Sequence, residues 1–249
     1  MVDLRSASRG RPLIIGHRGA SGEAPENTMA SFRLAVEQGA DILETDVHLS
    51  ADGVPVVIHD HTLDRTTNGH GLVARHTLAQ IQALDAGSWY SKEYAGERIP
   101  TLDDLIRWAS GKTLLAIEIK LGPIYYPDIE NKIVELLRRR DMVESAVIIS
   151  FDHRSIRKLK HLCPEVACGV LFACTPVRAS SLAIESRADA LLPHWSNLTK
   201  EMVEEAHADN LAVAPWCVDD ELEMKWVLSM GVDAVATNYP GRLASLLTK

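Results

Sequence analysis

Three acidic residues follow short apolar runs at spacings that place their side chains together. Glu44 and Asp46 lie two residues apart in the run 40–47, and Glu118 lies in the run 113–120. In a β-strand, residues two apart point to the same face. A set of carboxylate oxygens suits a hard divalent ion such as Mg²⁺ or Ca²⁺, with Mn²⁺ as a further option, better than zinc. We therefore expect Glu44, Asp46 and Glu118 to bind one divalent metal ion.

Two of the ten histidines are placed near these carboxylates. His17 is the last residue of the β-rich run 12–17, and His59 is the second-to-last residue of another, 53–60. An imidazole titrates near neutral pH, so two of them can serve as a general acid and a general base. Arg18 offers a planar fork that suits a phosphate, and Lys120 adds a second positive charge. Together these residues are typical of phosphoryl chemistry, although the two cations could instead simply pair with buried carboxylates.

Eight β-rich runs alternate with helical patterns along the chain. They are 12–17, 40–47, 113–120, 146–150, 166–172, 189–193, 211–216 and 232–238. An eightfold alternation in 249 residues predicts an α/β fold, a single (β/α)8 TIM barrel spanning 1–249. Its active site is expected at the C-terminal ends of the strands. An open doubly wound sheet is disfavoured, because HRGASGEAPEN does not fit the glycine-rich nucleotide fingerprint.

The run 53–60 follows the second predicted strand too closely for a parallel crossover. We therefore expect it to fold back antiparallel through a two-residue turn at Asp52-Gly53. This turn would place Asp46 directly opposite His59.

The next stretch, 61–100, carries only one short helical pattern. We expect it to form a small inserted subdomain within the barrel domain, either as an exposed decoration or as a wall of the site. Later in the chain, a helical pattern over 219–230 places Leu222, Trp226 and Met230 on one face.

The composition excludes several classes of protein. Lys and Arg number 26 against 34 Asp and Glu, giving a net charge of −8, which argues against binding to nucleic acid or stable association with membranes. No apolar run reaches the ~18 residues of a membrane-spanning helix. The N-terminus lacks the apolar core of a signal peptide, so we expect a cytoplasmic protein. The four cysteines fit no metal-binding spacing and are expected to be reduced thiols.

The chain resembles the glycerophosphodiester phosphodiesterase family, in its short bacterial-type cytosolic form. The resemblance lies in HRG at 17–19, PENT at 25–28, ETD at 44–46, DGVPVVIHD at 52–60, LDRTTNG at 63–69, IPTL at 99–102, EIK at 118–120 and TNYP at 237–240. The order of these motifs is that of the family. The family fold is a (β/α)8 barrel with a small insertion after the HD motif.

The resemblance implies an enzyme that hydrolyses small glycerophosphodiesters to sn-glycerol 3-phosphate and an alcohol. It implies that His17 and His59 form the general acid–base pair. It also implies that Glu44, Asp46 and Glu118 bind the metal. Arg18 and Lys120 would contact the phosphate.

Three further residues are candidates by the same resemblance. Asn27 would orient a ligand oxygen or its own loop, and Trp216 would form an aromatic wall for the glycerol. Asn238 is a weaker candidate. Two stretches depart from the family pattern: EIKLGP lacks an early proline, and Cys217-Val218-Asp219 replaces a Thr-Val-Asn-like stretch. We expect both departures to alter the rim, and so the accepted head group, without touching the metal or acid–base residues.

The sequence is also compatible with other functions. They are a lysophospholipase D-like activity on longer substrates, a Schiff-base barrel aldolase with Lys120 as nucleophile, and a non-catalytic binder of phosphorylated ligands. The attacking group is either water or the neighbouring glycerol hydroxyl, which would form a cyclic phosphate first. The head group, the physiological metal and the oligomeric state are left open.

Overall fold

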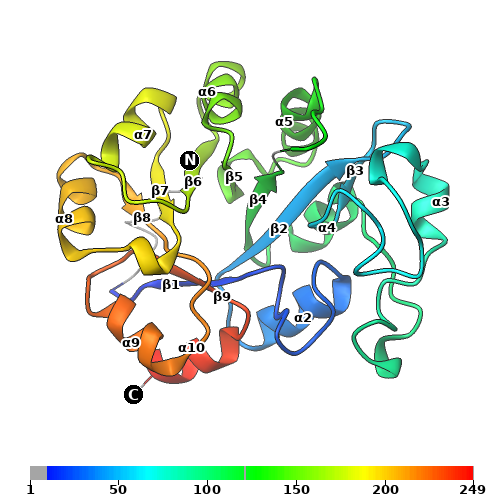
Figure 1. Cartoon of the computed structure of the whole chain (residues 1–249), viewed down its shortest axis with the longest axis horizontal. Helices are drawn as coiled ribbons and strands as arrows, with labels where there is room; N and C mark the ends of the chain where they lie inside the picture. The colour runs from blue at the N-terminus through cyan, green and yellow to red at the C-terminus, as the bar shows by residue number, and fades with distance from the viewer. Residues whose placement is uncertain (1–9, 121, 249) are drawn as a thin grey trace.

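The protein forms a barrel of parallel strands surrounded by helices (Figure 1). The computed structural model describes residues 10–120 and 122–248. Its barrel strands are β1 (Leu13–Gly16), β2 (Ile42–Leu49), β4 (Leu114–Ile119), β5 (Ala146–Ser150), β6 (Ala167–Phe172), β7 (Ala190–Pro193), β8 (Ala212–Val213) and β9 (Ala234–Thr237). Each of them overlaps one predicted run, so the (β/α)8 fold is confirmed.

The strand order closes the sheet into a barrel. Neighbouring strands pair in the order β8-β7-β6-β5-β4-β2-β1-β9. The two ends of this order meet where Asp233 N donates to Val213 O and Ala236 N donates to Pro215 O, both at 2.9 Å. In a closed parallel barrel the C-terminal ends of all the strands lie at the same end of the barrel. Enzymes with a (β/α)8 barrel have their active sites at this end.

The helices cover the outside of the barrel (Figure 1). They are α2 (Met29–Glu37), α4 (Leu102–Ala109), α5 (Ile129–Arg139), α6 (His153–Leu162), α7 (Ser180–Ser186), α8 (Lys200–Ala208), α9 (Glu221–Leu228) and α10 (Pro240–Leu247), with short 3₁₀ turns η3 (Val143–Ser145) and η4 (Trp195–Asn197). One large apolar cluster fills the layer between strands and helices, and a smaller one fills the barrel interior. Among the described residues, no helix is long and apolar enough to cross a membrane.

Helix α9 buries a different face from the predicted one. Leu222 and Trp226 are 75% and 44% exposed, whereas Met224 and Val227 are fully buried. Both faces have helical spacing, so periodicity alone could not distinguish between them. The ring of Trp226 instead meets Trp195 edge-on at 6.1 Å between centroids.

The predicted hairpin is present, but its predicted register is wrong by one residue. Strand β3 (Pro55–Val57) pairs antiparallel with β2, with Val47 opposite Val57, so Asp46 lies opposite Ile58 rather than His59. The turn contains three residues, not two, because Ser50 N donates to Val54 O. Gly53 takes the left-handed conformation, at φ +75°, that such a loop requires.

The segment 61–100 packs on a small apolar cluster of its own. It contains η1 (Val73–Arg75), α3 (Leu78–Gln82) and η2 (Lys92–Tyr94). The cluster joins residues of this segment to β3 and its end: Val56, Ile58, Leu63, Val73, Ile81, Ala86 and Ile99. A separate cluster under a long loop is consistent with a subdomain, and the division of the chain at 61–100 stays a prediction. The expected absence of a signal peptide concerns an N-terminus of which residues 1–9 lie outside the described ranges.

Candidate active site

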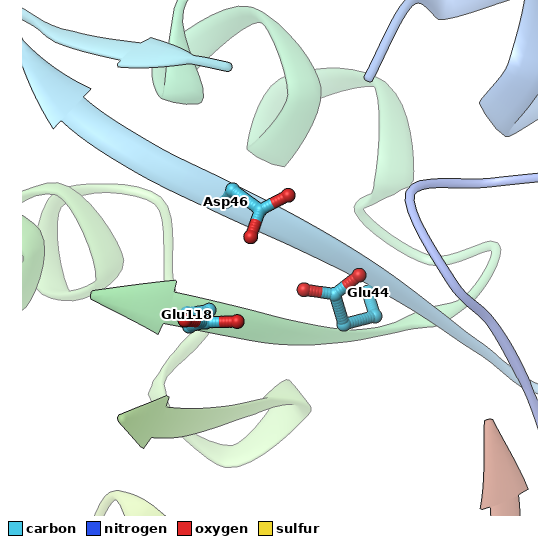
Figure 2. A group of neighbouring side chains, drawn as sticks. All are labelled: Glu44, Asp46 and Glu118. Carbon is cyan, nitrogen blue, oxygen red and sulfur yellow. The ribbon is translucent and has the colours of Figure 1, made fainter. Parts of the chain in front are cut away.

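Three buried carboxylates from two neighbouring strands share one space at the barrel centre (Figure 2). Glu44 and Asp46 project from the same face of β2, and Glu118 projects from β4. The register places Asp46 beside Glu118. One oxygen from each side chain lies within 4.8 Å of the others. The three residues predicted to bind a metal are therefore together.

Two cations lie against these carboxylates, and both approach Asp46. Lys120 Nζ lies 3.3 Å from Asp46 Oδ1 and 2.8 Å from Glu118 Oε1, and Arg18 Nε lies 3.2 Å from Asp46 Oδ2. Burial alone would raise the pKa of Asp46, but the charges of Lys120 and Arg18 hold it well below its usual range. Asp46 is therefore ionised at neutral pH.

The two glutamates are less well compensated. Burial, reinforced by the charge of Asp46, raises the pKa of Glu44 well above its usual range and that of Glu118 to about 7. Glu44 Oε1 is buried, and none of the described residues donates a hydrogen bond to it. Unpaired carboxylate oxygens in a buried place are costly. The oxygen donor set and its excess of negative charge thus fit a hard divalent ion.

The turn after β1 brings Arg18 to the carboxylates. Arg18 and Gly19 both take left-handed conformations, with φ of +54° and +84°. A Cβ on Gly19 would lie 2.3 Å from Ser31 Oγ on α2, so only glycine fits there. The turn allows the backbone N–H of Arg18 to donate to Glu44 Oε2 at 2.9 Å.

His17 lies at the end of β1 with its two ring nitrogens in different surroundings. Nε2 lies 3.9 Å from Glu44 Oε2, while Nδ1 lies 2.7 Å from Asn238 Oδ1. The amide nitrogen of Asn238 donates to Asp219 Oδ2 at 2.6 Å, so its oxygen must face the histidine. Nδ1 therefore carries the proton and Nε2 is left as an acceptor. Burial lowers the pKa of His17 to about 4, so the ring is neutral at pH 7.

Asp219 belongs to one of the stretches that were expected to affect only the rim. It accepts hydrogen bonds from the backbone and side-chain amides of Asn238. It also accepts from Thr237 Oγ1 at 3.0 Å. Asp219 thus holds the amide that orients His17, and its influence reaches beyond the rim.

His59 reaches the same cavity from the end of the hairpin, despite the different register. Its Nδ1 donates to Asp60 Oδ1 at 2.7 Å. Its backbone oxygen lies 3.0 Å from Nε2 of His48, a buried residue that sequence reasoning did not assign. Burial lowers the pKa of His48 to about 4, so this ring is neutral. The spacing of two residues could have indicated His48, because it places this residue on the same face of the strand as Glu44 and Asp46.

A cavity of about 170 Å³ opens at this end of the barrel. Its polar lining comprises His17, Arg18, Glu44, His59, Glu118 and Lys120. The rest is apolar and comprises Ile15, Ala116, Ile149, Phe151, Leu171, Leu192, Trp216 and Ala236. The Trp216 ring stands edge-on to Phe151 at 5.4 Å, and its N–H donates to Leu192 O. One small cavity therefore offers both ionic and apolar surfaces.

Asn27 orients a carboxylate in this structure. Its amide nitrogen donates to Asp46 Oδ2 at 2.8 Å, and its oxygen accepts from Thr45 Oγ1 at 3.1 Å. The residue is buried and has a left-handed φ of +58°. Its contacts fix the direction in which Asp46 points.

Comparison with known proteins places the chain in a family. The model of the glycerophosphoryl diester phosphodiesterase family matches residues 17–242. The chain belongs to this family. A curated glycerophosphodiester phosphodiesterase of Caldanaerobacter subterraneus subsp. tengcongensis is 41% identical over 240 residues, which cover 96% of this chain and 99% of the relative.

Solved structures agree with this family membership. A phosphodiesterase of Oleispira antarctica, in complex with the product sn-glycerol-3-phosphate, has a TM-score of 0.88 and 34% identity, covering 96% of this chain and 97% of its own. A glycerophosphodiester phosphodiesterase of Agrobacterium tumefaciens has a TM-score of 0.84 and 32% identity, covering 94% and 99%. The expected family resemblance and the expected class of enzyme, a phosphoric diester hydrolase, are confirmed.

Proposed function

We propose that the barrel hydrolyses glycerophosphodiesters to sn-glycerol 3-phosphate and an alcohol with the help of one divalent ion. The observation that carries this proposal is the group of three buried carboxylates within 4.8 Å, whose cavity is also lined by two histidines and two cations. The product complex of the Oleispira antarctica relative supports the choice of substrate. Mg²⁺ or Ca²⁺ is the expected ion, with Mn²⁺ as an alternative.

Glu44, Asp46 and Glu118 would hold the ion. When bound, a divalent ion offsets the negative charge that builds on a phosphoryl oxygen during the reaction. Arg18 and Lys120 line the same cavity and would bind the phosphate of the substrate.

The two histidines would move the protons. His17 is neutral and presents Nε2, so it can accept a proton. The Nδ1–H group of His59 donates a hydrogen bond to Asp60, so Nε2 is the nitrogen that can face the substrate. One imidazole would accept a proton from the attacking group at Nε2. The other, entering the step protonated on both ring nitrogens, would give its Nε2 proton to the leaving alkoxide. Trp216 and its apolar neighbours would contact the carbon atoms of the glycerol.

An aldolase mechanism is disfavoured by the surroundings of Lys120. Its ammonium lies 2.8 Å from Glu118 and 3.3 Å from Asp46. Burial would lower the pKa of Lys120, but these carboxylates raise it above its ordinary value, so the amine stays protonated. A Schiff-base nucleophile must be deprotonated. Borohydride with a carbonyl substrate should therefore trap no adduct.

The test is an assay for release of sn-glycerol 3-phosphate from glycerophosphodiesters with choline, ethanolamine or glycerol head groups, alongside a lysophospholipid. Each is measured in EDTA and with Mg²⁺, Ca²⁺ or Mn²⁺. We expect release only when an ion is present, and its loss in Glu44→Gln but not in the exposed control Glu185→Gln. Equal release in EDTA would remove the metal from the proposal. A cyclic phosphate seen by ³¹P NMR would identify the glycerol hydroxyl as the attacking group, and its absence would favour water.

A further inference from the structure

Arg65, in the segment 61–100, binds two carboxylates at once. Its Nη1 and Nη2 donate to the two oxygens of Glu26 at 2.7 and 2.8 Å. Its Nε and Nη2 donate to the two oxygens of Asp60 at 2.8 and 3.0 Å. Both contacts are therefore bidentate, the geometry in which an arginine fixes direction as well as charge.

Each of these carboxylates also holds a residue of the cavity. Glu26 Oε1 accepts from Arg18 Nη1 at 3.0 Å. Asp60 Oδ1 accepts from His59 Nδ1 at 2.7 Å. Arg65 is thus linked through one carboxylate to Arg18 and through another to His59, and both of these residues line the cavity.

The surroundings of Arg65 indicate an effect on position more than on stability. Its side chain is 43% exposed, whereas those of Glu26 and Asp60 are 12% and 26% exposed. Ion pairs with an exposed partner add little to the stability of a fold. Without Arg65, however, Glu26 would be left to Arg18 alone, and Asp60 would lose the contact that fixes its plane.

We propose that Arg65 is a positioning residue that orients Arg18 and His59 together, and that this is the contribution of the segment 61–100 to the reaction. The proposal rests on the roles proposed above for Arg18 and His59. It gives Glu26 and Asp60 separate tasks. Glu26 would act through Arg18 on phosphate binding, and Asp60 would act through His59 on proton transfer.

The kinetic test uses Arg65→Ala and Arg65→Lys. Loss of a supporting contact to catalytic groups predicts a ~10–100-fold fall in kcat/KM for Arg65→Ala, with a higher KM and a lower kcat. Arg65→Lys keeps the charge without the fork and should recover only part of this loss. Glu26→Gln should mainly raise KM, and Asp60→Asn should mainly lower kcat.

Two comparisons separate positioning from general loosening of the segment. Asp60→Asn should cost much less in the Arg65→Ala background than alone, because the two residues act on one histidine. Arg98→Ala is the matched control, since Arg98 donates to the backbone oxygens of Ala83 and Leu84 in the same segment. It should leave kcat and KM near the wild-type values. Wild-type kinetics for Arg65→Ala, additive effects with Asp60→Asn, or an equal loss in Arg98→Ala would overturn the proposal.

A readout that needs no activity distinguishes this proposal from the proposed function. In wild type, the ¹⁵N NMR signals of the His59 ring should report a single tautomer with the proton on Nδ1, because a carboxylate can only accept. In Arg65→Ala they should shift towards averaged values, and in Arg98→Ala they should not. An inactive wild-type protein with this pattern would refute the proposed function alone. Unchanged signals in Arg65→Ala would refute the positioning role alone.

Discussion

The buried carboxylates predict that the metal-free protein loses stability as the pH rises, and Glu118→Gln should reduce this loss. Burial, next to the charge of Asp46, raises the pKa of Glu118 from 4.5 to about 7. In the unfolded chain the group titrates near its ordinary value. The folded state therefore binds the Glu118 proton more tightly than the unfolded chain does. The stability that this proton adds to the fold is fully present below pH 4.5 and is lost as the pH rises through 7.

The size of this loss of stability follows from the difference between the pKa values of Glu118 in the unfolded and folded states. Each pH unit between the two pKa values is worth about 1.4 kcal/mol. Above pH 7, ionised Glu118 therefore costs the metal-free fold on the order of 3 kcal/mol. Glu118→Gln removes the titrating group, so its free energy of unfolding in EDTA should fall less between pH 4.5 and 8 than that of the wild type, by about this amount.

Urea unfolding in EDTA at several pH values measures this difference. Glu185→Gln is the control, since this exposed glutamate lies outside the cavity. With saturating Mg²⁺ the wild type should regain stability at pH 8, whereas Glu118→Gln should gain less, because binding to the folded state stabilises it. If the free energy of unfolding in EDTA changed with pH in the same way for the wild type and for Glu118→Gln, ionised Glu118 would not destabilise the fold and the prediction would be refuted.

Three further outcomes are expected. His17→Ala should lower kcat by ~10²–10⁴, since it removes a proton-transferring group. Asp219→Asn should lower kcat by ~10-fold with little change in KM, because the amide of Asn238 loses the carboxylate that orients it towards His17. Gly19→Ala should destabilise the fold by ~2–5 kcal/mol in urea unfolding, since it combines a left-handed φ with a clash against Ser31.

Two of these outcomes, those for His17 and Gly19, have a matched comparison. His70→Ala changes an exposed histidine and should keep normal turnover. Near-normal turnover in His17→Ala would exclude that residue from proton transfer. Gly96 has a similar φ of +92°, but no described atom would lie within 4 Å of an added Cβ, so Gly96→Ala should cost only about 1–2 kcal/mol. Equal costs at the two glycines would show that the clash at Gly19 is relieved.

The fold could be predicted from the sequence because apolar runs and helical patterns alternate regularly. The spacing of two residues also predicted that Glu44 and Asp46 share one face of a strand. Because active sites of (β/α)8 barrels lie at the C-terminal ends of the strands, Glu118 was expected to lie near them, and the structure has the three together. The hairpin register could not be obtained in the same way. It depends on whether the loop has two or three residues, and the Asp-Gly pair at 52–53 is compatible with both.

The supporting contacts of the site were also beyond sequence reasoning. Arg65 meets Glu26 across 39 positions, and His17 meets Asn238 across 221. No local pattern joins residues so far apart, because only the closed barrel and the packed segment bring them together. The buried face of α9 was missed for another reason, since two helical stripes competed and only packing selects one.

The pairing between β2 and β4 has a consequence for how the site would come apart. Its ladder runs over six consecutive residue pairs, including Asp46 with Glu118, and nearly all of these residues are buried. Strands of this kind open last during native-state fluctuations, whereas surface loops open first. The three carboxylates on β2 and β4 should therefore keep their positions under conditions in which the contacts of Asp60 and Arg65 are already broken. Under mild denaturant, binding of the proposed ion should persist after turnover has stopped.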